Sequence, residues 1–466
     1  MNILMVASEA TPFAKTGGLA DVVGALPAAL AARGERVAVV LPAYRENIYP
    51  TAPREAYKSL WIPLATGYAV QITQATERGV DFFFVNCPAL FDRDGIYGHS
   101  DDYLRFAVLS MAALDVARYL FLPHIIHCHD WQTGLLPVYM RENFRGDPTF
   151  AGVKVLLTIH NLGYQGIFPP STVAPLGLDP GLFNPDQLEF FGKLNFLKAG
   201  IAWSDAISTV SKGYAREIQT AEYGFGLEGF LRRHGPVRGI LNGVDYAEWN
   251  PEHDPFIARN YSSDDLSGKR ECKRALLAEL GLPGDELDRP LFGIISRFAA
   301  QKGFDLIAET ATQLLKQNLA LAVLGSGDML YESMFRDLAQ AYPRQVALRI
   351  GYDNALSHRI EAGADMFLMP SYYEPCGLSQ IYSLRYGTVP VVRATGGLDD
   401  TIDEETGFKF REYSGSALLE AIGSALDAYR HADRWVTRMR AGMRKDFSWS
   451  ASAAEYMRLY RRLRVG

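Results

Sequence analysis

Short runs of β-branched and aliphatic residues alternate along this chain with segments whose apolar residues recur every three or four positions. The first pattern is typical of buried strands, and the second of helices with one apolar face. The strand-like runs of the first half are 3–7, 37–41, 82–85, 125–126, 153–159 and 206–210. Those of the second half are 291–295, 319–324, 346–350, 366–369 and 389–392. This alternation predicts an α/β fold with parallel sheets covered by helices on both faces.

At 466 residues the chain is too long for one hydrophobic core, so we predict two doubly wound domains. The segment 242–261 has the Gly-, Asn- and Pro-rich composition of a linker, which places the boundary near residue 245. The predicted domains are 1–244 and 245–446, followed by a C-terminal helix over 447–466. The apolar residues of that helix form one stripe, which predicts that it packs on a core. They are Trp449, Ala453, Tyr456, Tyr460 and Leu463.

Composition narrows the class of protein. Apolar residues make up 48% and charged residues 21%, as in ordinary globular domains. A net charge of −6 argues against a nucleic-acid-binding surface, so any basic site must be local. No leader is visible, and the most apolar stretch, 106–122, is interrupted by Asp115 and Arg118, so we expect no membrane partner. The four cysteines lack C-x-x-C spacing, which favours a reducing cytoplasm over a disulfide framework or a zinc site.

The tetrapeptide Thr-Gly-Gly-Leu occurs twice, at 16–19 and at 395–398, each time between a β-branched run and a helical pattern. Adjacent glycines let the backbone approach a phosphate, and a helix start offers unpaired N–H groups. Lys15 precedes the first copy and Arg393 lies just before the second. One such pair is more often an ordinary turn, and neither copy is a Walker A or a dinucleotide fingerprint. The duplication with flanking cations predicts two anion-binding loops that hold one ligand between two domains.

Polar residues follow the predicted strands, where open parallel sheets bind their ligands. His127-Cys-His-Asp130-Trp131 follows 125–126, and His160 follows 153–159. In the second half, Arg297 follows 291–295, with Lys302 five residues on, and Glu374 follows 366–369. Any one of these residues alone would be read as a solvated loop side chain. Their recurrence at every such position in both halves predicts a site.

Three cations suit a diphosphate. Arg297 supplies a bidentate fork and Lys302 a point charge, with Lys15 from the other half. Together they can neutralise a leaving group whose charge grows as its bond breaks. Glu374 lies on the same side of the predicted sheet as the Arg–Lys pair, which favours a role in the site over a solvated carboxylate.

Seven motifs together resemble one known family. They are Lys15-Thr-Gly-Gly-Leu-Ala-Asp21, His127-Cys-His-Asp-Trp131, Thr158-Ile-His-Asn161, Leu241-Asn-Gly-Val-Asp245, Ser296-Arg-Phe-Ala-Ala-Gln-Lys-Gly303, Glu374-Pro-Cys-Gly-Leu378 and Arg393-Ala-Thr-Gly-Gly-Leu398. In order and spacing they closely resemble the motifs of bacterial glycogen synthases and plant starch synthases, glycosyltransferase family 5. The resemblance covers essentially the whole chain.

This resemblance implies a GT-B fold of two Rossmann-like domains facing a cleft, with the C-terminal helix packing back on the N-terminal domain. It implies a retaining glucosyltransferase of glycogen biosynthesis that moves glucose from ADP-glucose to the 4-hydroxyl at the non-reducing end of an α-1,4-glucan. No metal or other cofactor is expected, and the implied partners are this donor and this acceptor.

The resemblance also implies roles for single residues. Those expected to carry catalysis are Glu374 at the sugar, Lys302, Arg297 and Lys15 at the phosphates, and His160 at the glucose 6-hydroxyl. Those expected to complete the donor pocket are Gly17, Gly18, Asn242, Tyr352 (against the adenine), Cys376, Gly377, Thr395, Gly396 and Gly397. Asp21 and Asp130 are expected to lie toward the acceptor.

Transfer of glucose with retention of configuration can follow two routes. A covalent glycosyl-enzyme needs a carboxylate opposite the leaving group, whereas same-face attack uses the departing phosphate. Where the wider retaining clan has its second Glu this chain has Tyr382, and Gln380 is the nearest polar residue. We therefore favour same-face attack.

The sequence by itself leaves other interpretations of the function open. Asp92-Arg-Asp94 has the spelling of a metal-binding Asp-x-Asp motif, but it lies in a glycine-containing loop and is better read as a solvated turn. A phosphorylase or epimerase shares the architecture, and a phosphorylase would contain pyridoxal phosphate. A non-catalytic glucan-binding protein would be expected to lack Lys15, Lys302 or Glu374. A dehydrogenase would need the complete dinucleotide fingerprint.

Overall fold

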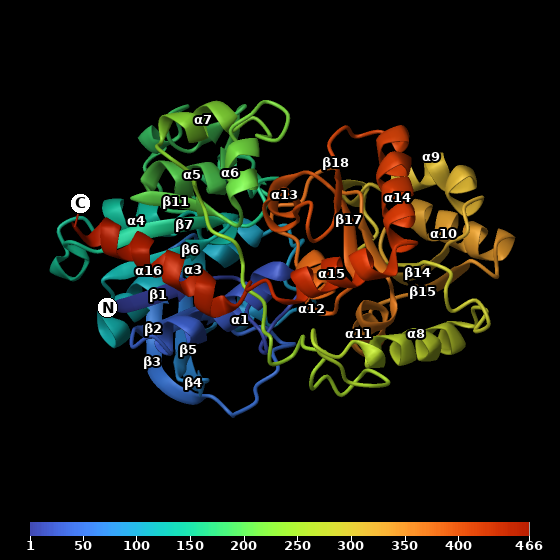
Figure 1. Cartoon of the computed structure of the whole chain (residues 1–466). Coiled ribbons are helices and arrows are strands. Elements are labelled where there is room, and N and C mark those ends of the chain that lie inside the picture. The colour runs from blue at the N-terminus through green and yellow to red at the C-terminus, as the bar shows by residue number, and fades with distance from the viewer. Residues whose placement is uncertain (466) are drawn as a thin grey trace. The chain divides into compact units, whose positions relative to one another are not determined.

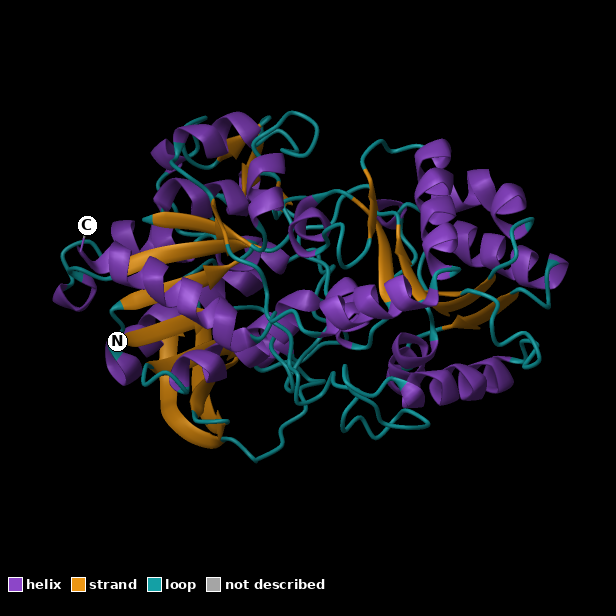
Figure 2. Ribbon diagram, in the orientation of Figure 1, coloured by secondary structure: helices purple, strands orange, loops and turns teal. Residues whose placement is uncertain are grey.

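The computed structural model describes residues 1–465 and divides into two units. The N-terminal unit comprises Met1–Val210, Ala215–Gly243 and Trp449–Gly466, and the C-terminal unit comprises Ser211–Tyr214 and Val244–Ser448. Both are doubly wound α/β units, as predicted; Figure 2 shows helices on either side of each sheet. None of the described helices is long and apolar enough to cross a membrane.

The N-terminal unit is built on a nine-stranded sheet of order β12-β11-β7-β6-β1-β2-β5-β4-β3 (Figure 1). Its strands are β1 (Asn2–Val6), β2 (Arg36–Pro42), β3 (Arg54–Ile62), β4 (Tyr68–Glu77), β5 (Val80–Asn86), β6 (Ile125–His129), β7 (Lys154–Ile159), β11 (Ala206–Thr209) and β12 (Arg238–Gly239). A small antiparallel sheet joins β8 (Ile167–Phe168), β10 (Lys193–Asn195) and β9 (Glu189–Phe190). The helices of the N-terminal unit are α1 (Gly18–Ala31), α2 (Pro88–Phe91), α3 (Asp102–Val116), α4 (Leu136–Glu142), α5 (Phe196–Trp203), α7 (Glu228–Arg233) and α16 (Trp449–Val465). Helix α6 (Lys212–Glu217) is shared, because its residues up to Tyr214 belong to the C-terminal unit.

The large sheet differs from the prediction at one edge. Strands β3 and β4 are antiparallel to their neighbours, whereas the other pairs are parallel. Most residues of β3 are exposed or half-buried, so this strand lacks the continuous apolar run of a buried parallel strand. The apolar pattern could not identify it.

Helix α16 confirms the predicted packing stripe. Trp449, Ala453, Tyr456 and Tyr460 are buried in one core with residues of α1, β1 and β2, and Leu463 packs at its edge. Figure 1 shows α16 lying along the strands of the N-terminal unit. The first strand and the last helix of the chain therefore belong to the same hydrophobic core.

The C-terminal unit has a six-stranded, fully parallel sheet of order β15-β14-β13-β16-β17-β18. Its strands are β13 (Leu291–Ile295), β14 (Ala320–Gly325), β15 (Val346–Ile350), β16 (Met366–Met369), β17 (Val389–Arg393) and β18 (Phe408–Phe410). Its helices are α8 (Ser267–Leu280), α9 (Phe304–Leu315), α10 (Met329–Ala341), α11 (Asn354–Gly363), α12 (Ser379–Arg385), α13 (Gly396–Thr401), α14 (Gly415–Tyr429) and α15 (Ala432–Met443). Alternate residues of β13 and β14 enter two different cores, one with α9, α10 and α14 and one with α8 and α11.

Candidate functional site

In the N-terminal unit, adjacent strands bring three predicted site residues to one edge. Strands β1, β6 and β7 are neighbours and run parallel. The loop of Lys15 follows β1, Asp130 follows β6 and His160 follows β7. The backbone N–H of His160 donates to Oδ1 of Asp130 at 2.7 Å, which joins the last two directly. The carboxyl edge of this sheet therefore carries the N-terminal part of the candidate site.

The first glycine loop ends in α1, which begins at Gly18. Nζ of Lys15 lies 2.6 Å from Oδ1 of Asp21 in the first turn, and both side chains are partly exposed. A Cβ added to Gly17 or Gly18 would meet no described atom within 4 Å. Packing within the chain therefore does not explain these two glycines, whereas the close approach of a ligand would.

A buried carboxylate organises this loop. Glu9 is 3% exposed and accepts hydrogen bonds from the backbone N–H of Thr16 at 2.5 Å and of Gly17 at 3.2 Å. The hydroxyl of Tyr97 donates to its other oxygen at 2.8 Å. The prediction that this loop offers unpaired N–H groups is therefore wrong at Gly17. The amide of Gly17 is thus engaged within the chain, whereas the side chain of Lys15 is partly exposed.

Asp130 is held in an unusual state. Its φ of +57° lies outside the regions that L-residues favour. Burial raises the pKa of its carboxyl to about 7, against the opposing effect of hydrogen bonds from the backbone N–H groups of His160 and Asn161. A strained, buried carboxylate with a pKa near neutrality is typical of a functional site.

The raised pKa predicts how Asp130 affects stability. Because the folded state binds this proton more tightly than the unfolded state, whose pKa is about 3.9, stability falls as the pH rises from about 4 to about 7. We expect Asp130→Asn, which keeps an acceptor oxygen, to raise the melting temperature by several degrees at pH 8 and to change it little at pH 4. Thermal unfolding at the two values measures this.

Asp101 serves as a control, because its pKa is shifted in the direction opposite to that of Asp130. Burial raises its pKa, but the hydrogen bond and charge of Arg93 outweigh burial and lower it. Stability from Asp101 is therefore present above the unfolded pKa, and Asp101→Asn is expected to lower the melting temperature at pH 8. Equal shifts of one sign in both variants would contradict the assigned state of Asp130.

In the C-terminal unit, β13 and β16 are neighbours, and the segments that follow them contain an ion pair of the candidate site. Nζ of Lys302 lies 2.6 Å from Oε2 of Glu374, which also accepts a hydrogen bond from the hydroxyl of Ser371 at 3.2 Å. Glu374 is 6% exposed. Arg297, just after β13, is exposed, so its guanidinium is accessible to solvent. The structure thus brings Lys302 and Glu374 together and leaves Arg297 at the surface.

The second glycine loop packs against the segment of Glu374. The backbone N–H of Gly397 donates to the carbonyl oxygen of Glu374 at 3.0 Å. A Cβ at Gly397 would overlap the carbonyl oxygen of Cys376, and Gly396 has a φ of +46°. Both glycines are therefore required by this close approach and turn, whatever else they bind.

The remaining predicted residues lie in different surroundings. Thr395 and Cys376 are buried, and Gly377 forms a turn at a φ of +69°. Asn242, in the N-terminal unit, is buried. Tyr352 follows β15 and is 83% exposed, so within its unit it presents a free aromatic face.

The position of Arg393 suggested a cation beside an anion-binding loop, but its guanidinium is engaged within the chain. Its guanidinium donates to the carbonyl oxygens of Tyr372 and Arg411 and lies over the rings of Tyr372 and Tyr413. It holds the end of β17 in place. The cation of the second glycine loop is therefore engaged by backbone and aromatic groups.

The positions that bear on the covalent route are occupied by packing side chains. Tyr382 stacks on Trp249, with ring centroids 4.0 Å apart. Gln380 is buried, and its amide donates to the carbonyl oxygens of Cys376 and Gly377.

Asp92 and Asp94, which have the spelling of a metal-binding motif, both pair with Arg45 on the surface. In residues 1–465 no three His, Cys, Asp or Glu side chains gather into a metal-binding group.

Sequence reasoning did not single out Glu9, and it gave no role to His129, although His129 lies within the motif 127–131. Glu9 lies just beyond β1, at the same edge of the sheet as Asp130, and that placement was the signal for it. His129 belongs to β6 itself, which extends past Ile126 through the two histidines. Polar residues continue a buried strand here because they find hydrogen-bond partners inside the unit.

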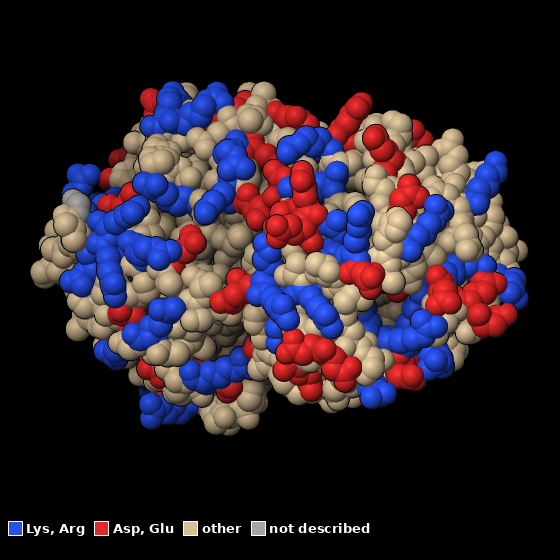
Figure 3. Space-filling view, viewed as in Figure 1, with Lys and Arg blue, Asp and Glu red and all other residues tan. Residues whose placement is uncertain are grey.

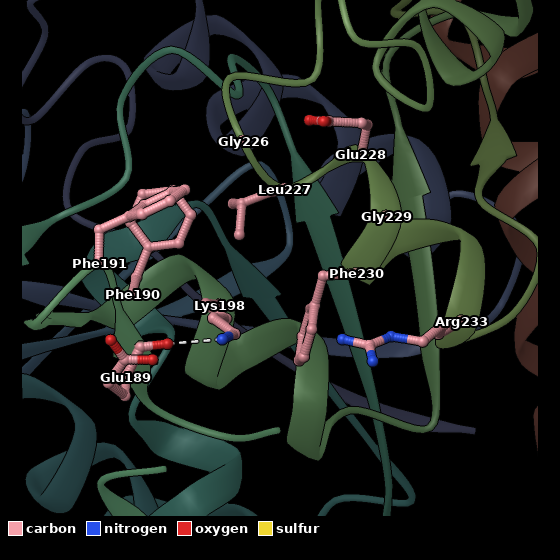
Figure 4. Close-up of a pocket in the computed structure, with 10 residues that line it drawn as sticks. All are labelled: Glu189, Phe190, Phe191, Lys198, Gly226, Leu227, Glu228, Gly229, Phe230 and Arg233. Carbon is pink, nitrogen blue, oxygen red and sulfur yellow. Dashed lines mark hydrogen bonds between the residues drawn. The ribbon is translucent and has the colours of Figure 1, made fainter. Parts of the chain in front are cut away.

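A hollow of about 560 Å³ lies elsewhere in the N-terminal unit (Figure 4). It is lined by Glu189, Phe190, Phe191, Lys198, Gly226, Leu227, Glu228, Gly229, Phe230 and Arg233. Figure 4 shows Lys198 turned toward the main chain at Glu189, to whose carbonyl oxygen it donates at 2.5 Å. The hollow contains none of the predicted site residues. Figure 3 shows both positive and negative side chains on the face in view, with Lys and Arg side chains gathered at its left.

Known proteins resemble this chain over its whole length. A family model described as starch synthase catalytic domain matches residues 2–233, and one described as glycosyl transferases group 1 matches residues 283–441. Glycogen synthase of Koribacter versatilis is 52% identical over 475 residues, covering 99% of this chain and 98% of that protein. Glycogen synthase of Myxococcus xanthus is 48% identical over 479 residues, covering 99% of each.

Solved structures agree. The catalytic domain of starch synthase IV from Arabidopsis thaliana, bound to ADP and acarbose, has a TM-score of 0.92 and 35% identity and covers 100% of this chain and 99% of that one. Sucrose-phosphate synthase from Thermosynechococcus elongatus, at 20% identity and a TM-score of 0.64, shares the fold.

Proposed function

Because this chain belongs to the family of bacterial glycogen synthases and plant starch synthases, we propose that it extends α-1,4-glucan with glucose from ADP-glucose. Glucose is transferred to the 4-hydroxyl at the non-reducing end with retention of configuration, and ADP is released. The observation that supports this most strongly is the Lys302–Glu374 pair at 2.6 Å, beyond neighbouring strands of the C-terminal unit. We assign this cation to the leaving group and this carboxylate to the sugar of a retaining transfer.

The cations act on the leaving group. As the bond between C1 of glucose and the phosphate oxygen breaks, negative charge grows on ADP, and Lys302, Arg297 and Lys15 neutralise it. Glu374 stabilises the positive charge that develops on the sugar. In the absence of donor, Lys302 and Glu374 neutralise each other, so neither charge is left uncompensated in its partly buried place.

The acceptor attacks from the face that ADP leaves. The bond between O4 of the acceptor and C1 forms as the phosphate departs, and the proton of the 4-hydroxyl passes to the phosphate oxygen. Tyr382 and Gln380, at and near the position of a second carboxylate, are a stacked ring and a backbone-bound amide, which supports this route over a covalent intermediate.

The other residues of the site bind the two substrates. We assign Asp21 and Asp130 to the acceptor side and His160 to the glucose 6-hydroxyl. The donor pocket is assigned to Gly17, Gly18, Asn242, Tyr352, Cys376, Gly377, Thr395, Gly396 and Gly397. The exposed ring of Tyr352 is available to stack on the adenine.

The two halves divide this work. We assign residues 1–244 to the acceptor side, residues 245–446 to the nucleotide sugar, and 447–466 to the helix that returns to the first domain. Since the proposed groups belong to both halves, we propose that the domains close on the substrates. We also propose the cytoplasm as the location, since no disulfide joins the cysteines of residues 1–465.

The test is incorporation of labelled glucose into glycogen from ADP-glucose and UDP-glucose competing in one assay, in excess chelator. We expect transfer from ADP-glucose to exceed transfer from UDP-glucose and to persist in the chelator. Preference for UDP-glucose would overturn the assigned donor. Activity abolished by the chelator and restored by manganese would overturn the metal-independent mechanism, and no transfer from either donor would overturn the function.

A further inference from the structure

Three histidine rings lie together inside the N-terminal unit. His127 and His129 belong to β6, and His160 follows the neighbouring strand β7. The ring centroids of His127 and His129 are 4.1 Å apart, and those of His129 and His160 are 5.2 Å apart. His127 and His129 are fully buried, whereas His160 is partly exposed. Only His160 can therefore meet a substrate directly.

Both ring nitrogens of His127 are already engaged. The hydroxyl of Tyr460, in α16, lies 2.8 Å from Nδ1, and the hydroxyl of Thr158 lies 2.6 Å from Nε2. Thr158 in turn lies 2.7 Å from the hydroxyl of Ser208. These hydrogen bonds hold the ring of His127 in one orientation. The fixed ring of His127 packs against the ring of His129.

Within residues 1–465, the ring of His129 has one hydrogen-bond partner, the ring of His160. Nδ1 of His129 lies 3.0 Å from Nε2 of His160. Nε2 of His129 is buried and has no hydrogen-bond partner in residues 1–465. The main chain of His160 is fixed as well, since its N–H donates to Asp130. His160 is thus held at its backbone and at one ring nitrogen.

Burial lowers the pKa of all three rings, to about 3 for His127 and His160. At neutral pH each ring therefore carries one proton, and the His129–His160 hydrogen bond has two arrangements. If His160 donates, the proton of His129 must lie on Nε2, where it has no acceptor. If His129 donates, only an unprotonated nitrogen is left without a partner. Buried N–H groups without acceptors are the rarer and costlier case.

We propose that His129 is a positioning residue that donates from Nδ1 to Nε2 of His160 and so keeps the proton of His160 on Nδ1. His160 then offers a hydrogen-bond donor, and not an acceptor, at its remaining nitrogen. The inference rests on the proposed function only in naming the oxygen that receives this bond, the 6-hydroxyl of the donor glucose. The tautomer itself is a property of the protein alone.

The tautomer is tested without any substrate. We would label the full chain with ¹⁵N-histidine and record two-bond ¹H–¹⁵N spectra, which distinguish protonated from unprotonated ring nitrogens. The signals that disappear in His160→Asn identify His160. We expect its Nδ1 to be protonated and its Nε2 to be bare. A wild-type His160 with the proton on Nε2 would overturn the proposal.

Two variants of His129 separate positioning from packing. His129→Leu removes the donor, and we expect the His160 signals to become those of a mixture of tautomers. His129→Asn retains an amide N–H close to the place of Nδ1, and we expect it to restore the wild-type tautomer. Tyr460→Phe is the matched control, because it removes one hydroxyl from the same buried stack without contacting His160. The proposal fails if Tyr460→Phe alters the His160 signals as much as His129→Leu does.

Kinetics connect the tautomer to the reaction. We expect His129→Leu to lower kcat/KM for ADP-glucose by about tenfold, the effect of one hydrogen bond. With a donor analogue that lacks the 6-hydroxyl, the same substitution should have little effect, and His129→Asn should recover most of the loss. Equal losses with both donors would show that His129 acts through packing alone. If the wild-type chain transferred no glucose, the proposed function would fail while the spectra still decided the tautomer.

Discussion

Replacing Lys302 with alanine is expected to lower kcat by about 10²–10³-fold, as for other electrostatic stabilisers of a transition state. The substitution removes the ammonium group that lies 2.6 Å from Glu374 and that we assign to the departing diphosphate. The loss should appear in kcat more than in KM, because the charge on ADP is largest after the bond to C1 has begun to break. Initial rates at saturating ADP-glucose and glycogen measure it.

Lys445 provides the matched control. Its Nζ also lies 2.6 Å from a carboxylate, that of Asp403, in the same unit, but neither residue is assigned to the site. Lys445→Ala is expected to leave kcat within about twofold of the wild type, because exposed ion pairs contribute little. Near-normal turnover of Lys302→Ala would refute the role of the cations at the leaving group.

The second large effect is on stability. Arg105, in α3, is fully buried; its guanidinium donates to the carbonyl oxygens of Leu90 and Ile96 and to Oδ1 of Asp102 at 2.6 Å. Arg105→Met fills similar space but leaves the Asp102 carboxylate without its cation. We expect a loss of about 3–5 kcal/mol in the free energy of unfolding of the N-terminal unit. Hydrogen exchange of the core amides of that unit measures this without assuming that both units unfold together.

Arg93 is the control for this prediction. It pairs with Asp101 at 2.7 Å in the same region, but both side chains are partly exposed. Arg93→Met is expected to lower stability by about 1 kcal/mol or less. If the two variants lost the same amount, burial would not be the reason for the strength of the Arg105 interactions.

The strands of both sheets could be predicted because buried parallel strands are continuous apolar runs. The runs at 291–295, 346–350 and 366–369 have the same bounds as β13, β15 and β16. Strand β3 could not be found in this way, since its exposed residues do not form such a run. The stripe of α16 was visible for the same reason as the strands, because helical spacing is a local property of the chain.

The site was predictable to the extent that it follows the ends of strands. Asp130, His160, Lys302 and Glu374 could be singled out because each lies beyond the end of an apolar run. The buried carboxylate of Glu9 was not, because one of its partners is Tyr97, 88 residues along the chain. Nor did local spacing reveal that the second glycine loop takes its shape from the carbonyl oxygens of Glu374 and Cys376.

The sequence by itself determined the two α/β halves, the family and the residues that carry charge at the strand ends, since all of these depend on local order along the chain. Only the tertiary structure decided which of these groups touch. It places the amine of Lys302 against Glu374, surrounds Asp130 so that its pKa rises to about 7, and turns Nδ1 of His129 to His160. Distances between residues far apart in sequence, and the loss of water around a buried group, exist only once the chain has folded.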